Sequence, residues 1–528
     1  MTPPGDLPER FNVSTAFLDH NLEHGRGDRA AIYSGDERVT YRRLLDQVNR
    51  AGNALRGLGV RPEERVFLLL LDSPELAYLF WGAIRIGAVA VPTNTALKPH
   101  DYGYMLQDSR ARVLVVSEEL LPTVEPALRE LPALSHVVVS GPGTPPPGRH
   151  ALRDLLAAAS PVLDPAPTHR DEPAFWLWSS GSTGPPKGTI HLHHNMVCTA
   201  DLYARTVLGI REDDICFSVA KLYHAYGLGN GLYFPSRVGA ASVLHPGRFN
   251  PKLYFELIHR YRPTLFFSAP TAYAAMLAQG EPADLGAVRL CVSAGEPLPA
   301  ALFTRWKERF GVEILDGIGS TEALHIYITN RAGRVRPGSS GEVVPGYTVR
   351  IVDEAGADVP AGEIGDLLVS GESLAVGYWN RHDRTKQAFR GDWYMSGDKY
   401  YRDPEGFYWY CGRSDDMLKA GGQWVSPAEV EATLIQHPAV LESGVVGKDD
   451  RDGLVKPYAF VVLKPGYAPS DALVTELQAF VRDKIAAFKY PRWIEFVAEL
   501  PKTDTGKIQR FRLRQRLAAE AAETPARS

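Results

Sequence analysis

The polar segment 178–188 concentrates hydroxyls, glycines and one cation in a short stretch: Trp-Ser-Ser-Gly-Ser-Thr-Gly-Pro-Pro-Lys-Gly. Glycines let backbone N–H groups approach an anion closely, while the hydroxyls add donors and Lys187 adds charge. The segment therefore predicts a phosphate-binding loop whose donors are Ser179, Ser180, Gly181, Ser182, Thr183, Gly184 and Lys187.

This loop differs from the Walker A motif, which needs glycine before its lysine, a hydroxyl after it and a helix that opens at the loop. Here Pro186 precedes Lys187, Gly188 follows it, and the flanking segments 175–177 and 189–191 have the composition of strands. We therefore expect a hairpin loop over a triphosphate. The alternative is a flexible Ser/Gly surface turn.

Further segments match one protein family in order along the chain. With the loop above, they resemble the signatures of the adenylate-forming superfamily, which comprises acyl-CoA synthetases, peptide-synthetase adenylation domains and luciferases. The matching segments are 293–297, 316–322, 394–398, 412–416 and 501–507. Six matches in register are far more specific than any one of them.

The resemblance implies a nucleotide site. Beyond the phosphate loop, it assigns nucleotide binding to Ser293, Ala294, Gly295, Glu296, Pro297, Asp316, Gly317, Ile318, Gly319, Asp398 and Arg413. Within this set, Asp398 would accept hydrogen bonds from the ribose hydroxyls and Arg413 would donate to the same sugar. A structural ion pair between the two is the alternative.

The implied reaction brings two anions together, since a carboxylate must attack the α-phosphorus of ATP. A cation has to bridge them, and a metal has to bind the polyphosphate. The resemblance gives the bridge to Lys507, the α-phosphate hydroxyl to Thr321 and the Mg²⁺ ligand to Glu322. The plainer alternatives are a solvated lysine on a terminal loop and an acid at the start of a surface helix.

Two further assignments concern movement and the thiol. Asp415 matches the hinge about which the small domain turns, because one site cannot seat both Lys507 and the thiol path. Gly421 and Gly422 would line the tunnel for coenzyme A, where absent side chains let the backbone approach the pantetheine arm. A simple turn at these glycines is compatible with that interpretation.

The segments 221–230 and 323–326 resemble those of benzoate-CoA ligases. The implied pocket is small and flat, Tyr226 would stack on an aryl ring, and His224 would form the gate to ATP. Its walls would be His224, Ala225, Tyr226, Gly319, His325 and Ile326. Ordinary core packing is the alternative. The histidines at 191, 193 and 194 lack a nearby carboxylate or cysteine, so we expect structural roles for them.

Size and composition are those of an ordinary soluble globular protein. The chain has 528 residues, 45% hydrophobic and 23% charged, with a formal net charge of −4. This balance gives no sign of a nucleic-acid surface. The amino terminus lacks a secretory pattern, the apolar run 66–71 is too short for a membrane span, and the four cysteines lack paired spacing. We expect a cytoplasmic protein without a membrane or nucleic-acid partner.

The alternation of strand-like and helical segments predicts the fold class. A strand at 66–71, a helix at 74–86 and a strand at 87–92 form a βαβ unit, and strand-like runs recur at 112–116, 136–139 and 241–244. We expect a large N-terminal domain of layered α/β sheets, residues 1–414, with a small β-barrel-like subdomain. A small α+β domain, 415–528, follows, and its last residues from 518 should fray.

Taken together, these observations predict an ATP-dependent aryl-CoA ligase that uses ATP, Mg²⁺ and coenzyme A to convert benzoate through benzoyl-AMP, as in aromatic degradation. A substituted benzoate, such as a hydroxy- or aminobenzoate, or another small carboxylic acid stays open as the substrate. A carrier-protein loading module and a nonenzymatic acyl-adenylate sensor are rivals of other classes. The oligomeric state, a homodimer included, cannot be read from one chain.

Overall fold

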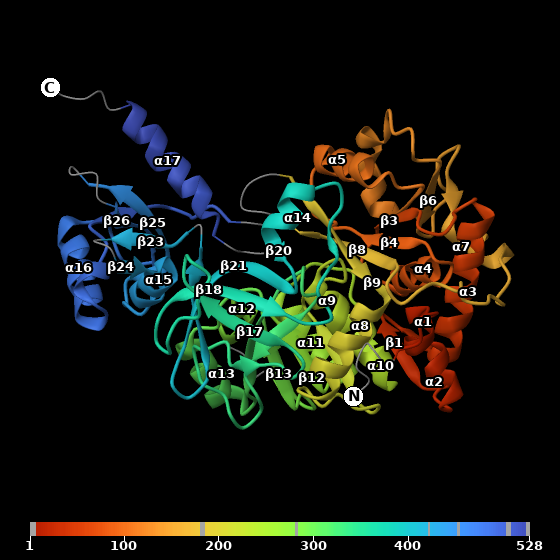
Figure 1. The fold of residues 1–528 in the computed structure, drawn as a ribbon, viewed down its shortest axis with the longest axis horizontal. Helices are drawn as coiled ribbons and strands as arrows, with labels where there is room; N and C mark the ends of the chain where they lie inside the picture. The colour runs from red at the N-terminus through yellow and green to blue at the C-terminus, as the bar shows by residue number, and fades with distance from the viewer. Residues whose placement is uncertain are drawn as a thin grey trace. The chain divides into compact units, whose positions relative to one another are not determined.

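The computed structural model describes residues 7–179, 185–279, 284–414, 416–420, 423–450, 455–502 and 508–523. The chain divides into two compact units, Met1–Thr348 with Val369–Tyr394, and Val349–Leu368 with Met395–Ser528 (Figure 1). The expected border at 414/415 lies inside the second unit. Because Asp415 is outside the described residues, the border and the hinge stay predictions.

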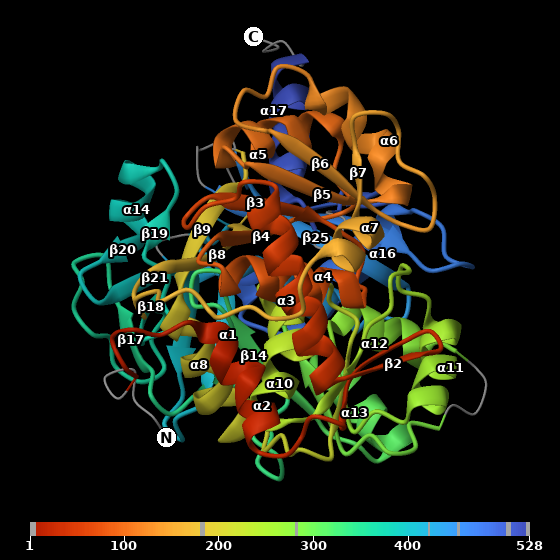
Figure 2. The ribbon, with the colours of Figure 1, turned by 90° about the vertical axis from the view of Figure 1, so that its right-hand side faces the viewer.

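The first unit contains a sheet that holds the predicted βαβ unit. In spatial order its strands, eight among the described residues, are β19 (Gly377–Tyr378), β9 (Lys187–Leu192), β8 (Pro173–Ser179), β4 (Val89–Pro92), β3 (Arg65–Leu69), β5 (Val113–Ser117), β6 (His136–Ser140) and β7 (His150–Ala151). From β8 to β7 the neighbours are parallel, and β9 pairs antiparallel with both β8 and β19. Figure 2 shows β5, β6 and β7 side by side.

Helices cover this sheet because its strands are apolar on both faces. Val66, Phe67, Leu68 and Leu69 of β3 are all fully buried, as expected for a parallel strand between two helical layers. The helices and short turns of this part are α1 (Val13–Phe17), α2 (Asp19–Glu23), α3 (Tyr41–Gly57), α4 (Pro74–Arg85), α5 (Pro99–Ser109), η2 (Glu118–Leu120), α6 (Leu121–Val124), η3 (Glu125–Leu128) and α7 (Leu152–Ala158).

A second sheet of the first unit positions most of the candidate site. Its nine strands among the described residues are, in spatial order, β16 (Glu342–Val343), β15 (Ile326–Thr329), β14 (Ile314–Gly319), β13 (Leu290–Ser293), β12 (Leu265–Ser268), β10 (Ile215–Ser218), β11 (Ala241–Val243), β1 (Ala30–Ser34) and β2 (Glu37–Thr40). The central strands are parallel, so their carboxyl ends share one edge. This is the arrangement in which α/β enzymes place their ligands.

The helices that connect these strands include two π-helical turns, a form that is often found at functional sites. They are α8 (His193–Thr199), η4 (Ala200–Arg205), α9 (Ala225–Leu228), η5 (Gly229–Tyr233), α10 (Phe234–Val238), α11 (Pro251–Tyr261), α12 (Pro270–Leu277) and α13 (Ala300–Phe310), of which η4 and η5 are the π-helices. A further helix, α14 (His382–Ala388), lies between β19 and β20. α12 and α13 pack on one face of the second sheet through Tyr273 and Trp306, both fully buried.

A smaller sheet follows in the chain at the place where the sequence predicts the barrel-like subdomain. Its strands are β17 (Thr348–Val352), β18 (Gly365–Ser370), β21 (Trp393–Arg402), β20 (Phe389–Arg390) and β22 (Tyr408–Arg413). The pairs β20–β21 and β21–β22 are antiparallel. The division into two units passes through β17, β18 and β21.

The C-terminal part is the expected α+β module. It comprises β23 (Leu418–Ala420), β24 (Gln423–Val425), α15 (Pro427–Ile435), β25 (Val440–Asp449), β26 (Val455–Leu463), α16 (Asp471–Lys484), η6 (Ala487–Lys489), β27 (Trp493–Phe496) and α17 (Arg510–Glu523). Side chains of β25 and β26 alternate between two cores. Val445 and Val461 join the core of α15 and α16, while Val446 and Phe460 join that of α17.

The predicted fold class is confirmed, but one detail of the C-terminus is wrong. We expected the chain to fray from residue 518, whereas α17 continues to Glu523. Two causes explain the difference. Alanine and glutamate are strong helix formers, and Leu513 and Leu517 anchor the helix on β25 and β26.

Candidate active site

The strands that flank the predicted phosphate loop form the expected hairpin. Ser179 at the end of β8 pairs with Lys187 at the start of β9 in antiparallel register. Ser179 is buried and accepts a hydrogen bond from Thr189 Oγ1 at 3.2 Å. The loop residues Ser180, Gly181, Ser182, Thr183 and Gly184 lie outside the described residues, so their phosphate contacts stay a prediction.

The ammonium of Lys187 does not project freely from this hairpin. Its Nζ lies 4.2 Å from the centroid of the Tyr378 ring, on the neighbouring strand β19. A cation over an aromatic face is held electrostatically. The hairpin lysine therefore has a fixed position next to the rest of the site.

Two predicted nucleotide segments meet at the edge of the second sheet. β13 and β14 are parallel neighbours with Ser293 opposite Asp316, so the loops that follow both strands leave from the same edge. Gly295 adopts φ +94°, a conformation that favours glycine. Ala294 is buried and Glu296 half-buried, whereas Gly295 and Pro297 are exposed. The segment thus offers backbone and apolar surface at the strand end.

Asp316 is a buried carboxyl group at the same edge. Burial raises its pKa to about 8, although the N–H of Leu298, 3.3 Å from Oδ2, works in the opposite direction. Its Oδ1 has no hydrogen-bond partner among the residues that the structure describes. At neutral pH this carboxyl group is therefore largely protonated and able to donate a hydrogen bond.

The turn between β14 and β15 carries the predicted catalytic pair. The carbonyl of Thr321 accepts a hydrogen bond from His191 Nε2 at 2.8 Å, and the carbonyl of Glu322 accepts one from Ala375 N at 2.8 Å. Leu324 has φ +67°, which is strained for a branched residue and recurs at functional sites. The turn is thus held from both sides in a conformation that the local sequence does not favour.

The Glu322 side chain is 7% exposed, and each of its carboxylate oxygens accepts a hydrogen bond. Its Oε1 accepts from the Tyr378 hydroxyl at 2.8 Å, and its Oε2 accepts from the Tyr394 hydroxyl at 3.1 Å. A carboxylate has about four lone-pair positions, so two remain for another ligand. Because Mg²⁺ prefers carboxylate oxygen and needs few protein ligands beside nucleotide phosphates, Glu322 fits the metal that the sequence analysis assigns to it.

The two predicted ribose ligands lie in the second unit, on paired strands. Asp398 and Arg413 are opposite each other on β21 and β22, and Arg413 Nη1 donates to Asp398 Oδ1 at 3.1 Å. The same nitrogen donates to the Ser396 carbonyl at 2.9 Å. Gly397, between Ser396 and Asp398 in the chain, has φ +74°, and a Cβ there would lie 2.7 Å from Arg413 Nη2. The ion pair considered in the sequence analysis is present, and the ribose contact stays a prediction.

The predicted walls of the acid pocket come together in the first unit. His325 Nε2 donates to the Tyr226 carbonyl at 3.3 Å, and the two rings are 5.5 Å apart. Gly319 pairs with Ile326 across the β14–β15 hairpin. A Cβ on Gly319 would lie 2.5 Å from the His325 carbonyl oxygen, so the position has no room for a side chain.

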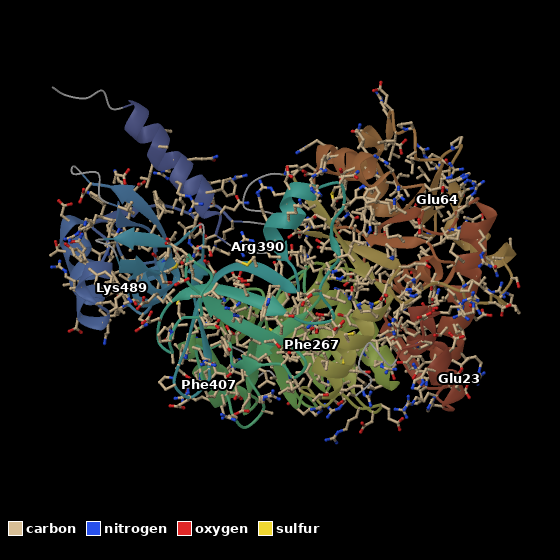
Figure 3. The ribbon with its side chains drawn as sticks, in the orientation of Figure 1. Glu23, Glu64, Phe267, Arg390, Phe407 and Lys489 are labelled. Atoms are coloured by element: carbon tan, nitrogen blue, oxygen red, sulfur yellow. The ribbon has the colours of Figure 1, made fainter. Side chains whose placement is uncertain are left out.

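The Tyr226 ring is anchored at its far end. Its hydroxyl donates to the Val292 carbonyl at 2.9 Å, and its ring meets Phe267 of β12 edge-on at 6.4 Å. Phe267 is labelled in Figure 3. Ala225, which precedes it at the start of α9, is buried, and half-buried His224 precedes the helix as its N-cap residue. The aromatic wall is therefore rigid.

His325 is a neutral histidine in an aromatic environment. Its ring lies 4.4 Å from that of Phe234 and 5.3 Å from that of Tyr203. Burial lowers its pKa to about 3, although the Tyr226 carbonyl works in the opposite direction. Because Nε2 donates, Nδ1 is an acceptor, and it finds no partner within the described part of the chain.

The histidines at 191, 193 and 194 have separate partners, as expected for structural residues. His191 bonds to Thr321, His193 Nδ1 accepts from Val13 N at 3.1 Å, and His194 Nδ1 lies 3.0 Å from Asp171 Oδ1. Burial lowers the pKa of His191 to about 4 and that of His193 to about 3.

Besides the loop residues 180–184, four further predicted positions lie outside the described residues: Asp415, Gly421, Gly422 and Lys507. The strands β23 and β24 that flank the two glycines pair antiparallel, with Ala420 opposite Gln423. The roles of all four positions stay predictions.

Tyr378 and Tyr394 are site residues that the sequence did not predict. Tyr394 belongs to the matching segment 394–398, in which the resemblance assigns a role only to Asp398. Tyr378 is 56 positions from Glu322 in the chain, and no local pattern links the two. Only the pairing of β19 with β9 brings the phenol to the carboxylate.

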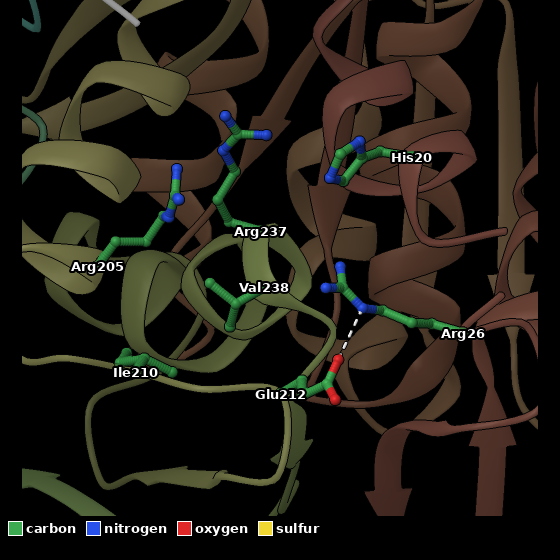
Figure 4. A pocket seen from close by; sticks show the side chains of 7 residues that line it. All are labelled: His20, Arg26, Arg205, Ile210, Glu212, Arg237 and Val238. Atoms are coloured by element: carbon green, nitrogen blue, oxygen red, sulfur yellow. Dashed lines mark hydrogen bonds and ion pairs between the residues drawn. The ribbon is translucent and has the colours of Figure 1, made fainter. Parts of the chain in front are cut away.

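A separate cavity of about 420 Å³ is lined by none of the predicted site residues. Its lining residues are His20, Arg26, Arg205, Ile210, Glu212, Arg237 and Val238 (Figure 4). Arg26 pairs with Glu212 at 3.1 Å, whereas Arg205 and Arg237 both pair with Asp201 at 3.0 and 2.9 Å. These acids compensate the arginine charges within the protein.

Beside this cavity, His20, Glu23 and His24 place possible metal ligands within 4.8 Å of one another. Burial lowers the pKa of His20, and His24, Arg237 and Arg26 lower it further. The same positive surroundings disfavour a cation, so this group is a weak metal site. In the described part of the chain, the structure has no helix that is long and apolar enough to cross a membrane.

The chain matches two family models and is similar to known proteins over most of its length. The family model of the AMP-binding enzymes matches residues 18–379, and that of the AMP-binding enzyme C-terminal domain matches residues 429–507. The benzoate–CoA ligase of Thauera aromatica is 52% identical over 518 residues, which are 97% of this chain and 98% of that protein.

Two solved structures share the fold closely. An anthranilate CoA ligase, AuaEII, in complex with anthranoyl-AMP has a TM-score of 0.93 at 48% identity, over 98% of this chain and 99% of that one. A benzoate CoA ligase from Burkholderia xenovorans LB400 has a TM-score of 0.87 at 48% identity, over 96% and 100%. The resemblance in the sequence is confirmed: the chain belongs to the family of AMP-binding enzymes.

Proposed function

We propose that this protein is an ATP-dependent aryl-CoA ligase that converts benzoate, ATP and coenzyme A to benzoyl-CoA, AMP and diphosphate. The observation that carries the proposal is its end-to-end likeness to the benzoate–CoA ligase of Thauera aromatica. The wall formed by Tyr226, Gly319, His325 and Ile326 supports it, because it is compact and aromatic.

In the first half-reaction, a carboxylate oxygen of benzoate attacks the α-phosphorus of ATP. The bond from this phosphorus to the bridging oxygen of the β-phosphate breaks, and diphosphate leaves with that electron pair. The ammonium of Lys507 would neutralise the meeting anions, and Thr321 would donate to the α-phosphate. Glu322 would hold Mg²⁺, which would supply charge stabilisation for the phosphates.

In the second half-reaction, the sulfur of coenzyme A attacks the acyl carbon of benzoyl-AMP. The acyl–oxygen bond breaks, AMP leaves, and the thiol proton passes to solvent. We propose that Asp415 is the hinge that removes Lys507 and admits the thiol past Gly421 and Gly422. The two steps require such a movement, because Lys507 and the thiol of coenzyme A cannot occupy one site at the same time.

Nucleotide binding would use the residues that the family resemblance assigns to it. The phosphate hairpin holds the triphosphate, the segment after β13 receives the base, and Asp398 and Arg413 bind the ribose. We place the reaction in the cytoplasm, because all four cysteines are free and buried.

The direct test measures diphosphate release with benzoate, with and without coenzyme A, and identifies the thioester by mass spectrometry. We expect benzoyl-CoA to form in step with AMP and diphosphate. Turnover that ignores coenzyme A would favour a carrier-protein loading module. A preference for acetate over benzoate would overturn the aryl assignment.

A second candidate is a ligase for a ring-substituted benzoate, and an unsatisfied hydrogen-bond acceptor favours it. His325 Nδ1 is a buried acceptor with no partner among the described residues, and an amino or hydroxyl group on the ring would satisfy it. The anthranilate CoA ligase with the same fold supports this candidate.

A panel of benzoate, 2-aminobenzoate, 3-hydroxybenzoate and 4-hydroxybenzoate separates the two candidates through kcat/KM. If a substituent bonds to Nδ1, His325→Leu should lower kcat/KM for that acid by about 10-fold relative to benzoate. An equal loss for all four acids would assign His325 to packing alone.

A further inference from the structure

Glu322 is held by two phenols that come from separate strands. The Tyr378 hydroxyl reaches Oε1 from β19 at 2.8 Å, and the Tyr394 hydroxyl reaches Oε2 from β21 at 3.1 Å. Both tyrosines are largely buried, at 8% and 5% exposure. Each oxygen of the carboxylate thus has its own donor, which fixes the plane of the group as well as its position.

The two phenols are themselves fixed. Tyr378 pairs with Thr189 of β9, and its N–H donates to Thr385 Oγ1 at 3.0 Å. Tyr394 pairs with Phe389, whose ring packs against both tyrosines at centroid distances of 5.7 and 5.4 Å. The spacing of the two hydroxyls is therefore set by packing rather than by the carboxylate that they bind.

Phenols orient a carboxylate without cancelling its charge. An arginine or lysine in the same place would compete with a metal cation for the negative group, whereas a neutral hydroxyl leaves the charge available. Outer hydrogen-bond partners of this kind orient metal ligands and tune their affinity. The lone pairs not used by the phenols stay open to a cation.

Lys187 is connected to the same carboxylate through one of the phenols. Its ammonium lies 4.2 Å from the centroid of the ring whose hydroxyl bonds to Glu322. A cation on the ring face draws electron density from the phenol and makes its hydroxyl a better donor. The Tyr378 side chain thus connects the lysine of the phosphate hairpin to the carboxylate proposed to bind the metal.

We propose that Tyr378 and Tyr394 are positioning residues that hold Glu322 in the orientation required for the divalent cation of the nucleotide. The proposal rests on the role that the proposed function gives to Glu322. Neither tyrosine needs to contact the substrate, and neither gains or loses a proton. Their contribution is metal affinity in the nucleotide complex.

The test measures Mn²⁺ binding by electron paramagnetic resonance to the full chain loaded with α,β-methylene-ATP, which cannot transfer its adenylyl group because a methylene replaces the bridging oxygen that leaves with diphosphate. We expect Tyr378→Phe and Tyr394→Phe each to weaken Mn²⁺ binding by about 10-fold or more. The matched control is Tyr41→Phe, which removes a buried hydroxyl that bonds to the Ala240 carbonyl at 2.6 Å. This control should bind Mn²⁺ as the wild type does, and thermal unfolding would confirm that all three variants fold.

Glu322→Gln tests the metal role of Glu322 separately from the positioning role of the two tyrosines. The measurement contains no carboxylic acid substrate. If Glu322→Gln weakens Mn²⁺ binding while both tyrosine variants bind it normally, the positioning role is wrong and the metal role of Glu322 stands. If Glu322→Gln also binds normally, Glu322 is not the metal ligand and both are wrong. A failure of benzoate as substrate would appear only in the diphosphate assay and would leave the positioning role intact.

Discussion

The ammonium of Lys187 lies over the face of Tyr378, 4.2 Å from the ring centroid. One residue begins β9 of the phosphate hairpin and the other lies on β19, which the chain adds to the same sheet much later. The contact fixes the direction of a long, flexible side chain before any nucleotide arrives. Such preorganisation lowers the entropic cost of binding an anion.

Replacement of Lys187 by methionine should weaken ATP binding while keeping the side-chain length. The loss of one charged donor to phosphate predicts an increase of about 10- to 100-fold in KM for ATP. Steady-state kinetics of the first half-reaction measures it. Lys252→Met, at an exposed position of α11, should leave KM unchanged, and an unaltered KM in Lys187→Met would exclude the phosphate role.

Removal of the Lys507 ammonium should act on only one half of the reaction. Without this charge the two anions meet unscreened, so Lys507→Ala should slow benzoate-dependent ATP–diphosphate exchange by about 100-fold or more. The thioester step, started from synthetic benzoyl-AMP and coenzyme A, should keep its rate. Lys484→Ala, an exposed lysine of α16 in the same unit, is the control. Equal slowing of both steps would contradict the bridging role.

A methyl group at Gly319 should damage the acid pocket. Its Cβ would lie 2.5 Å from the His325 carbonyl oxygen and 2.8 Å from the Ile326 nitrogen, both backbone atoms. Gly319→Ala should therefore cost about 1–3 kcal/mol and raise KM for the acid. Gly57→Ala, exposed at the end of α3 with nothing near its Cβ, should instead stabilise by about 0.5–1 kcal/mol. Urea unfolding and acid titrations compare the pair.

The buried neutral histidines predict a loss of stability in acid. Burial lowers the pKa of His193 to about 3, from an ordinary value near 6.5, so below pH 6.5 the unfolded chain takes up a proton that the native protein refuses. His193 therefore costs about 1.4 kcal/mol of stability for each pH unit from about 6.5 down to about 3.

His193→Asn isolates this effect, because its amide oxygen can accept the Val13 N–H that Nδ1 accepts now. Relative to the wild type, the variant should gain about 1.4 kcal/mol per pH unit as the pH falls below 6.5. Urea unfolding at pH 7.5, 6 and 5 measures the difference. A constant difference for His193→Asn would mean that its native pKa is not lowered.

The strands and helices could be predicted where the local pattern is unambiguous. The apolar run at 66–71 predicts a buried strand, and the apolar run before Pro92 predicts another. Pro74 suits the first turn of a helix. These became β3, α4 and β4 within one or two residues. The flanks of the phosphate loop were predictable for the same reason, since their length and apolar content suit paired strands.

The amino-acid sequence by itself indicated the fold class through its alternating strand and helix patterns, and the family through the resemblance of its motifs, because both are local features of the chain. The residues that these motifs assign to adenylation stay predictions. Only the tertiary structure decided that Tyr378 and Tyr394 hold Glu322, that Arg413 pairs with Asp398, and that the pKa of Asp316 is raised to about 8. The physical reason is that hydrogen bonding and burial depend on which distant segments become neighbours, and the pairing of strands far apart in the chain sets that.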